Sequence, residues 1–159
     1  MTQLKPGDTF PALSVGLTGG GTLQLPDALN GHFGVVLFFR SEFCPYCKAQ
    51  LRAFERAHDS LAEVDAQVVA LSVDDEATTR GLIEKLHLRF PVGHSADAPA
   101  IAAATGAFVN EQRGHLESTG FVLDPTGAVI VSVYSSSAIG RLVPEDVVGL
   151  LRYVRQHAA

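Results

Sequence analysis

The chain has two cysteines, Cys44 and Cys47, and both lie in the stretch FFRSEFCPYCKAQL, residues 38–51. An apolar run precedes them and a helical pattern follows. If the helix begins near Cys44, that sulfur lies at the helix N-terminus and Cys47 follows about one turn later. The free N–H groups and the positive end of the helix dipole stabilise a thiolate there. Cys44 is therefore the predicted nucleophile, and Cys47 is close enough to form a disulfide with it.

The residues around the two cysteines favour the same chemistry. Pro45 suits the first position of a helix, where its missing N–H costs nothing and its fixed φ starts the helix. Arg40, Lys48 and Arg52 place positive charge nearby, which could lower the pKa of Cys44 further; the alternative for Arg40 is a solvated loop residue without this effect. A reactive thiolate is the expected result.

Two other roles for the cysteines have less support. A structural zinc site normally needs four ligands, and the chain has neither a second C-x-x-C pair nor a pair of histidines at H-x3–5-H spacing. Free cysteines are also often buried and inert, but here they flank a proline at a strand-to-helix junction. We therefore expect a redox dithiol, with no metal and no bound cofactor.

Length and charge limit the class of protein. A chain of 159 residues with 47% hydrophobic residues predicts one domain, residues 1–159. The net charge of −5 provides no basic stripe for nucleic acid or for an anionic membrane. The longest apolar run is far too short to span a bilayer, and the N-terminus lacks the pattern of a signal peptide. We expect a soluble, cytoplasmic protein. The cytoplasm is reducing, and a C-x-x-C pair there is typically catalytic or metal-binding.

The central elements are predicted from apolar runs. GVVLFF (34–39) and QVVALSV (67–73) are rich in β-branched residues, which favours strands that are covered on both faces. A helical pattern follows each strand and gives two strand-then-helix units in parallel order. In the first helix, one face is expected to carry Leu51, Phe54, His58 and Leu61.

Turn signals complete the layout. The glycines of residues 17–22 predict an N-terminal β-hairpin, and Pro125 to Gly127 predict a second, antiparallel hairpin near the C-terminus. A short helix is expected near residues 98–104 and a final one from Pro144. The result is an α/β fold of the thioredoxin-like type, with a mixed central β-sheet flanked by helices and an N-terminal β-hairpin. The cysteines fall at the carboxyl end of a central strand, where α/β proteins commonly place their chemistry.

The chain resembles the alkyl hydroperoxide reductase/thiol-specific antioxidant family, the peroxiredoxin-like branch of the thioredoxin superfamily. The similarity covers nearly the whole chain. It is carried, in the family's order, by LKPGDTFPALSV, VVLFFRSEFCPYCKAQL, VVALSVD, FPV, TGFVLDPTGAVIVS and AIGRLVPEDVVGLLRYV.

The resemblance also implies roles for individual residues. Cys44 matches the family's peroxidatic cysteine, Ser41 matches the hydroxyl three residues before it, and Arg141 matches one of the family's arginines. Two positions depart from the pattern: Leu37 replaces a proline, and Ser118 lies where another arginine is expected. In addition, the C-P-Y-C sequence itself is similar to the dithiol of glutaredoxins and thioredoxins.

Three functions remain open at this point. The first is a peroxidase in which Cys44 reduces a hydroperoxide, becomes a sulfenic acid and is resolved by Cys47, with a thioredoxin-like protein or a small thiol as reductant. The second is a thiol:disulfide oxidoreductase that uses the same two residues on a disulfide substrate. The third is a binding or chaperone module whose thiols are idle. The resemblance is also compatible with a homodimer.

Overall fold

The computed structural model describes residues 2–157, and its centre is a seven-stranded mixed sheet in the order β2-β1-β5-β4-β3-β8-β9. The strands are β1 (Leu13–Leu17), β2 (Thr22–Leu25), β3 (Phe33–Phe38), β4 (Ala66–Leu71), β5 (Val92–His94), β8 (Thr119–Leu123) and β9 (Val129–Tyr134). β3 and β4 run parallel, whereas β8 runs antiparallel to β3 on its other side. The predicted mixed sheet is therefore confirmed.

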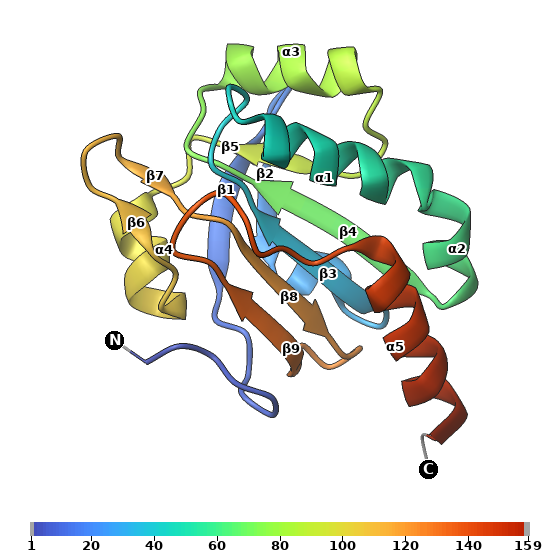
Figure 1. The fold of residues 1–159 in the computed structure, drawn as a ribbon. Helices are drawn as coiled ribbons and strands as arrows, with labels where there is room; N and C mark the ends of the chain where they lie inside the picture. Colours follow the sequence, from blue (N-terminus) through green and yellow to red (C-terminus); the bar gives the residue numbers. More distant parts are fainter. Residues whose placement is uncertain (1, 158–159) are drawn as a thin grey trace.

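Helices cover both faces of this sheet (Figure 1). The helical elements are η1 (Asp27–Leu29), α1 (Pro45–Arg56), α2 (His58–Glu63), α3 (Glu76–Leu86), α4 (Ala98–Thr105) and α5 (Pro144–His157). α1, α3 and α5 lie against one face and α4 lies against the other. A small two-stranded sheet of β6 (Val109–Asn110) and β7 (His115–Leu116) follows α4.

The alternation of side chains along β3 explains the two layers of core. Val35 and Leu37 point to the face that carries α1, α3 and α5, while Val36 and Phe38 point to the opposite face. All four side chains have an exposed fraction of 0%. β3 is thus a strand buried on both faces, as its near-continuous apolar sequence predicted.

Both predicted hairpins are present. β1 pairs antiparallel with β2, and β8 pairs antiparallel with β9. At the second turn, Gly127 has a φ of +90° and donates its N–H to the carbonyl of Asp124 at 3.0 Å. A residue with a side chain would be strained at this φ, which explains the glycine.

One predicted element differs from the structure. One helix was expected to include Leu51 and Leu61, but the structure has two. The helix is interrupted at Ala57, which is the C-cap of α1 and the N-cap of α2. Leu51, Phe54 and Leu61 are buried as expected, but His58 is exposed. None of the helices within residues 2–157 has the length and apolar character needed to cross a bilayer.

Candidate active site

Cys44 is the N-cap of α1, the position that the sequence predicted for it. Pro45 follows as the first helical residue, and the N–H of Cys47 donates to the sulfur of Cys44 at 3.3 Å. A thiolate at this point replaces the side-chain oxygen that usually caps a helix, and it lies at the positive end of the dipole. The local geometry therefore stabilises the ionised form of Cys44.

Two arginines reach this sulfur, one from its own loop and one from a distant segment. Nη1 of Arg40, in the loop after β3, lies 3.9 Å from the sulfur of Cys44. Nη2 of Arg141, in the segment before α5, lies 3.8 Å from the same sulfur and 3.1 Å from the sulfur of Cys47. Both cysteines thus face the same guanidinium group.

The two thiols differ in acidity. Burial opposes ionisation of Cys44, but hydrogen bonds from the Cys47 thiol and amide, with Arg40 and the charge of Arg141, hold the pKa of Cys44 below its ordinary value. Burial and the hydrogen bond to Cys44 raise the pKa of Cys47, although Arg141 opposes this. Cys44 is therefore the stronger candidate nucleophile of the two.

Both sulfurs lie inside the protein. Cys44 has an exposed fraction of 1% and Cys47 of 0%, and they are free thiols rather than a disulfide. The arginines beside them are only half-buried. Since a buried sulfur is reached more easily by a small molecule than by a protein disulfide, this burial favours a small oxidant as the partner of Cys44.

Ser41 is held by another residue. Its hydroxyl donates to Oδ1 of Asp74 at 2.6 Å, and the N–H of Glu42 donates to Oδ2 at 2.9 Å. Asp74 follows β4, so this carboxylate fixes the cysteine loop to the neighbouring strand. Among the described residues, the Ser41 hydroxyl contacts neither sulfur, and its expected role toward a peroxide stays a prediction.

Gln50 is a site residue that we did not predict. It lies on α1 with an exposed fraction of 7%, where its Oε1 accepts from Nη1 of Arg141 at 2.7 Å and its Nε2 donates to the carbonyl of Leu142 at 2.9 Å. Arg141 also donates through Nε to the carbonyl of Ala138 at 2.7 Å. The sequence did carry a signal for this role, because Gln50 is a polar residue among the buried positions of α1.

The two departures noted in the sequence have clear positions. Leu37 is the penultimate residue of β3, where it lies opposite Ala70 of β4 and Gly120 of β8. Ser118 is buried just before β8, and its carbonyl accepts from the N–H of Ser135 at 2.9 Å. Neither residue brings a charged group to the cysteines.

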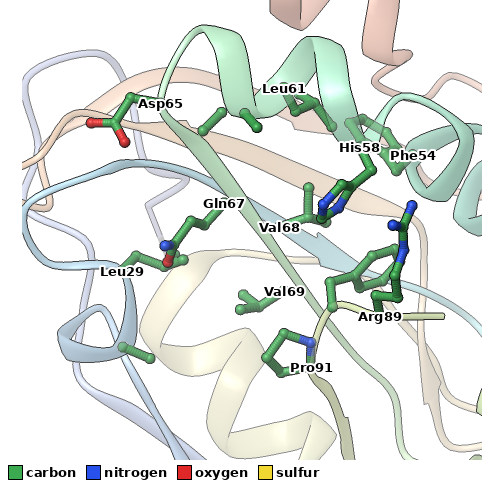
Figure 2. A pocket seen from close by; sticks show the side chains of 14 residues that line it. Leu29, Phe54, His58, Leu61, Asp65, Gln67, Val68, Val69, Arg89 and Pro91 are labelled. Carbon is green, nitrogen blue, oxygen red and sulfur yellow. The ribbon is translucent and has the colours of Figure 1, made fainter.

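Other candidate sites lie apart from the cysteines. A cavity of about 450 Å³ opens at the amino end of β4, where α1 and α2 contribute Phe54, His58 and Leu61 to its lining (Figure 2). Neither cysteine lines it. Within residues 2–157, no three His, Cys, Asp or Glu side chains are grouped so that they could hold a metal ion.

A model of the AhpC/TSA family matches residues 6–132 of this chain. This chain belongs to the AhpC/TSA family. A peroxiredoxin of Methanothermobacter thermautotrophicus is 30% identical over 155 residues, which cover 94% of this chain and 72% of the relative. A peroxiredoxin of Thermotoga petrophila is 27% identical over 156 residues, with 94% and 69% covered.

Solved structures agree on the fold of this AhpC/TSA member. Peroxidoxin BcpB from Mycobacterium tuberculosis superposes with a TM-score of 0.82 at 21% identity, covering 96% of this chain and 99% of that one. A mutant of peroxiredoxin 6 of Arenicola marina gives a TM-score of 0.83 at 17% identity, covering 96% and 74%. The thioredoxin-like fold is confirmed. Family membership identifies a thiol-based peroxidase and favours that function over the disulfide oxidoreductase.

Proposed function

We propose that this protein reduces hydroperoxides with Cys44 as the attacking group and Cys47 as the resolving one. The observation that carries the proposal is the surroundings of the Cys44 sulfur: the N-terminus of α1, the amide of Cys47 and the guanidinium groups of Arg40 and Arg141 all face it. These groups stabilise both a thiolate and the negative oxygen that develops when a peroxide is cleaved.

The first step forms a sulfur–oxygen bond. The Cys44 thiolate attacks one peroxide oxygen, the O–O bond breaks, and the departing oxygen leaves as an alcohol or water after it takes a proton from solvent. Cys44 is oxidised to a sulfenic acid while the peroxide is reduced by two electrons. The half-buried Arg40 and Arg141 are placed to donate hydrogen bonds to these oxygens.

The second step uses the neighbouring thiol. Cys47 attacks the sulfenic sulfur of Cys44, a disulfide forms, and water leaves with the thiol proton and the sulfenic hydroxyl. Arg141 lies against Cys47 at 3.1 Å, where it can assist ionisation of this thiol as it attacks. The spacing of the two cysteines along one helical turn supports this pairing.

Regeneration requires two electrons from outside. A thioredoxin-like protein or a small thiol reduces the disulfide by exchange, and its sulfur needs access to sulfurs that are buried in the reduced protein. We further propose, from the family, a homodimeric and cytoplasmic enzyme that needs no bound cofactor, and one domain spanning residues 1–159. The two core layers on one shared sheet support the single domain.

Peroxide consumption by a Cys47→Ser variant tests the assignment of roles. We expect this variant to consume one equivalent of hydrogen peroxide and to stop with Cys44 as a sulfenic acid that a dimedone-type reagent traps. The wild type should instead form a Cys44–Cys47 disulfide. The proposed roles would be overturned if the Cys44→Ser variant still consumed hydrogen peroxide, or if the reagent trapped a sulfenic acid on Cys47 of that variant.

A further inference from the structure

Glu117 is a buried carboxylate next to the active site. It lies just before β8 with an exposed fraction of 6%, and its Oε1 accepts from Nε of Arg40 at 2.8 Å. Its backbone is also fixed, since its N–H donates to the carbonyl of Phe108 at 2.8 Å and its carbonyl accepts from the Thr119 hydroxyl at 3.0 Å. A buried carboxylate destabilises a protein unless it is paired, so this ion pair is a fixed contact rather than a surface one.

His115 lies near the same carboxylate oxygen. Its Nδ1 lies 3.6 Å from Oε1 of Glu117 and donates to the carbonyl of Leu116 at 3.0 Å. The ring is 2% exposed, and its Nε2 has no hydrogen-bond partner among the described residues. The side chain of Glu117 is therefore buried against an imidazole and hydrogen-bonded to a guanidinium.

This arrangement fixes the direction of Arg40. Its Nε is bound to Glu117, its Nη1 points to the sulfur of Cys44 at 3.9 Å, and its backbone N–H donates to the sulfur of Cys47 at 3.3 Å. A planar guanidinium that is bound along one edge can present its remaining N–H groups in one direction only. Arg40 thus brings a positive charge to the Cys44 sulfur, whereas Ser118, next to Glu117, is uncharged.

We propose that Glu117 is a positioning residue that holds the guanidinium of Arg40 against the sulfur of Cys44 and the peroxide oxygen. The part that concerns peroxide rests on the proposed function, whereas the effect on the thiolate does not. Arg40 contacts a reacting atom and is the catalytic member of the pair. It stays protonated throughout and contributes hydrogen bonds and charge, so the bonds made and broken are those of the steps above.

A simple charge effect would have the opposite sign. If Glu117 acted only as a nearby negative charge, removing it would favour the thiolate and lower the pKa of Cys44. If Glu117 positions Arg40, removing it releases the guanidinium and raises that pKa. Within residues 2–157, the other titratable or charged groups in contact with Cys44 are Cys47 and Arg141, and both are left unchanged in this comparison.

The experiment compares Glu117→Ala, Glu117→Gln, Arg40→Ala and the double variant Arg40→Ala/Glu117→Ala. The pH dependence of Cys44 alkylation gives its pKa, and mixing reduced protein with hydrogen peroxide gives the rate constant of the first oxidation. Arg113→Ala is the matched control, because this exposed arginine stacks on Phe43 at 5.1 Å and its hydrogen bonds include neither sulfur.

We expect Glu117→Ala and Arg40→Ala each to raise the Cys44 pKa and to slow oxidation by roughly a hundredfold, the usual effect of losing one donor to a developing oxyanion. The double variant should be no slower than Arg40→Ala, since Glu117 acts through Arg40. Glu117→Gln keeps a side-chain oxygen that can accept from Nε of Arg40, so its oxidation rate should lie between those of Glu117→Ala and the wild type. Arg113→Ala should match the wild type.

Several results would overturn the inference. A folded Glu117→Ala protein with an unchanged or lowered Cys44 pKa would do so, as would a Glu117→Gln protein that oxidises more slowly than Glu117→Ala. The inference would also fail if the rate reductions of Arg40→Ala and Glu117→Ala multiplied in the double variant, because Glu117 would then act independently of Arg40. If hydrogen peroxide fails to oxidise Cys44 in the wild type, the proposed function fails, and the sign of the pKa change in Glu117→Ala still decides whether Glu117 positions Arg40.

Discussion

Arg141 faces both cysteines, with its Nη2 3.1 Å from the sulfur of Cys47 and 3.8 Å from that of Cys44. A single guanidinium therefore stabilises negative charge on whichever sulfur carries it. This suits a reaction in which Cys44 attacks first and Cys47 ionises later.

Replacing Arg141 tests its effect on the thiolate. Arg141→Ala removes a charge that lowers the pKa of Cys44, so the pH profile of Cys44 alkylation should move to higher pH. The first oxidation by hydrogen peroxide at neutral pH should slow by roughly a hundredfold. Arg152→Ala, which changes an exposed arginine of α5, is the control and should leave both unchanged. An unmoved pH profile in Arg141→Ala would contradict this role.

Gln50 should matter for both stability and rate. Gln50→Leu keeps roughly the same volume, but it leaves the buried carbonyl of Leu142 without its donor and removes one of the hydrogen bonds that hold Arg141. We expect a loss of about 1–3 kcal/mol in the free energy of unfolding. Urea unfolding measures the loss, and the oxidation rate of Cys44 should fall with it. Gln24→Leu, at an exposed position of β2, serves as control. Full activity in Gln50→Leu would show that Arg141 does not need this anchor.

Gly120 permits the close approach of the segment that carries Arg141. A Cβ at Gly120 would lie 2.7 Å from Cδ1 of Leu142, so Gly120→Ala must displace Leu142. We expect a loss of about 1–3 kcal/mol in unfolding free energy, with slower oxidation of Cys44.

Gly81 offers the matched comparison. It lies within α3 with no atom near the position of an added Cβ, so Gly81→Ala should stabilise the protein by about 0.5–1 kcal/mol. Thermal unfolding of the two variants should therefore shift in opposite directions. Equal effects would show that close packing at Gly120 is unimportant.

Asp124 should make the stability depend on pH. Burial opposes its ionisation, but hydrogen bonds from Thr126, Ala128 and Gly127 outweigh this and lower its pKa. A carboxylate with a lowered folded pKa stabilises the protein above about pH 4, and this contribution is lost as the pH falls through the folded pKa.

Asp124→Ala should therefore cost about 1–2 kcal/mol at neutral pH and progressively less in acid. Urea unfolding at a series of pH values measures the difference, with Glu111→Gln as an exposed control. A difference that stays constant down to low pH would contradict the role of the charge.

The sequence was informative where a single segment determines the structure. The apolar run of β3 and the C-P-Y-C turn each carry their own signal, so the buried strand and the helix start could both be predicted. β5, β6 and β7 were missed because strands of two or three residues show no periodicity. β5 is nevertheless held between β1 and β4 in the middle of the sheet.

Contacts between distant segments were harder to predict. Arg40 and Glu117 are 77 residues apart, and their separation in the sequence does not indicate a contact. They meet because β3, which precedes Arg40, pairs with β8, which follows Glu117. Arg141 was predicted from family resemblance, but its anchor on Gln50 was not. The attachment of Ser41 to Asp74 depends likewise on the pairing of β3 with β4.

The most direct measurement is the mass of tryptic peptides after the reduced protein receives one equivalent of hydrogen peroxide. We predict a Cys44–Cys47 disulfide in the wild type, a dimedone adduct on Cys44 in Cys47→Ser, and no reaction in Cys44→Ser. Unmodified cysteines in the wild type, while hydrogen peroxide remains in solution, would contradict the account.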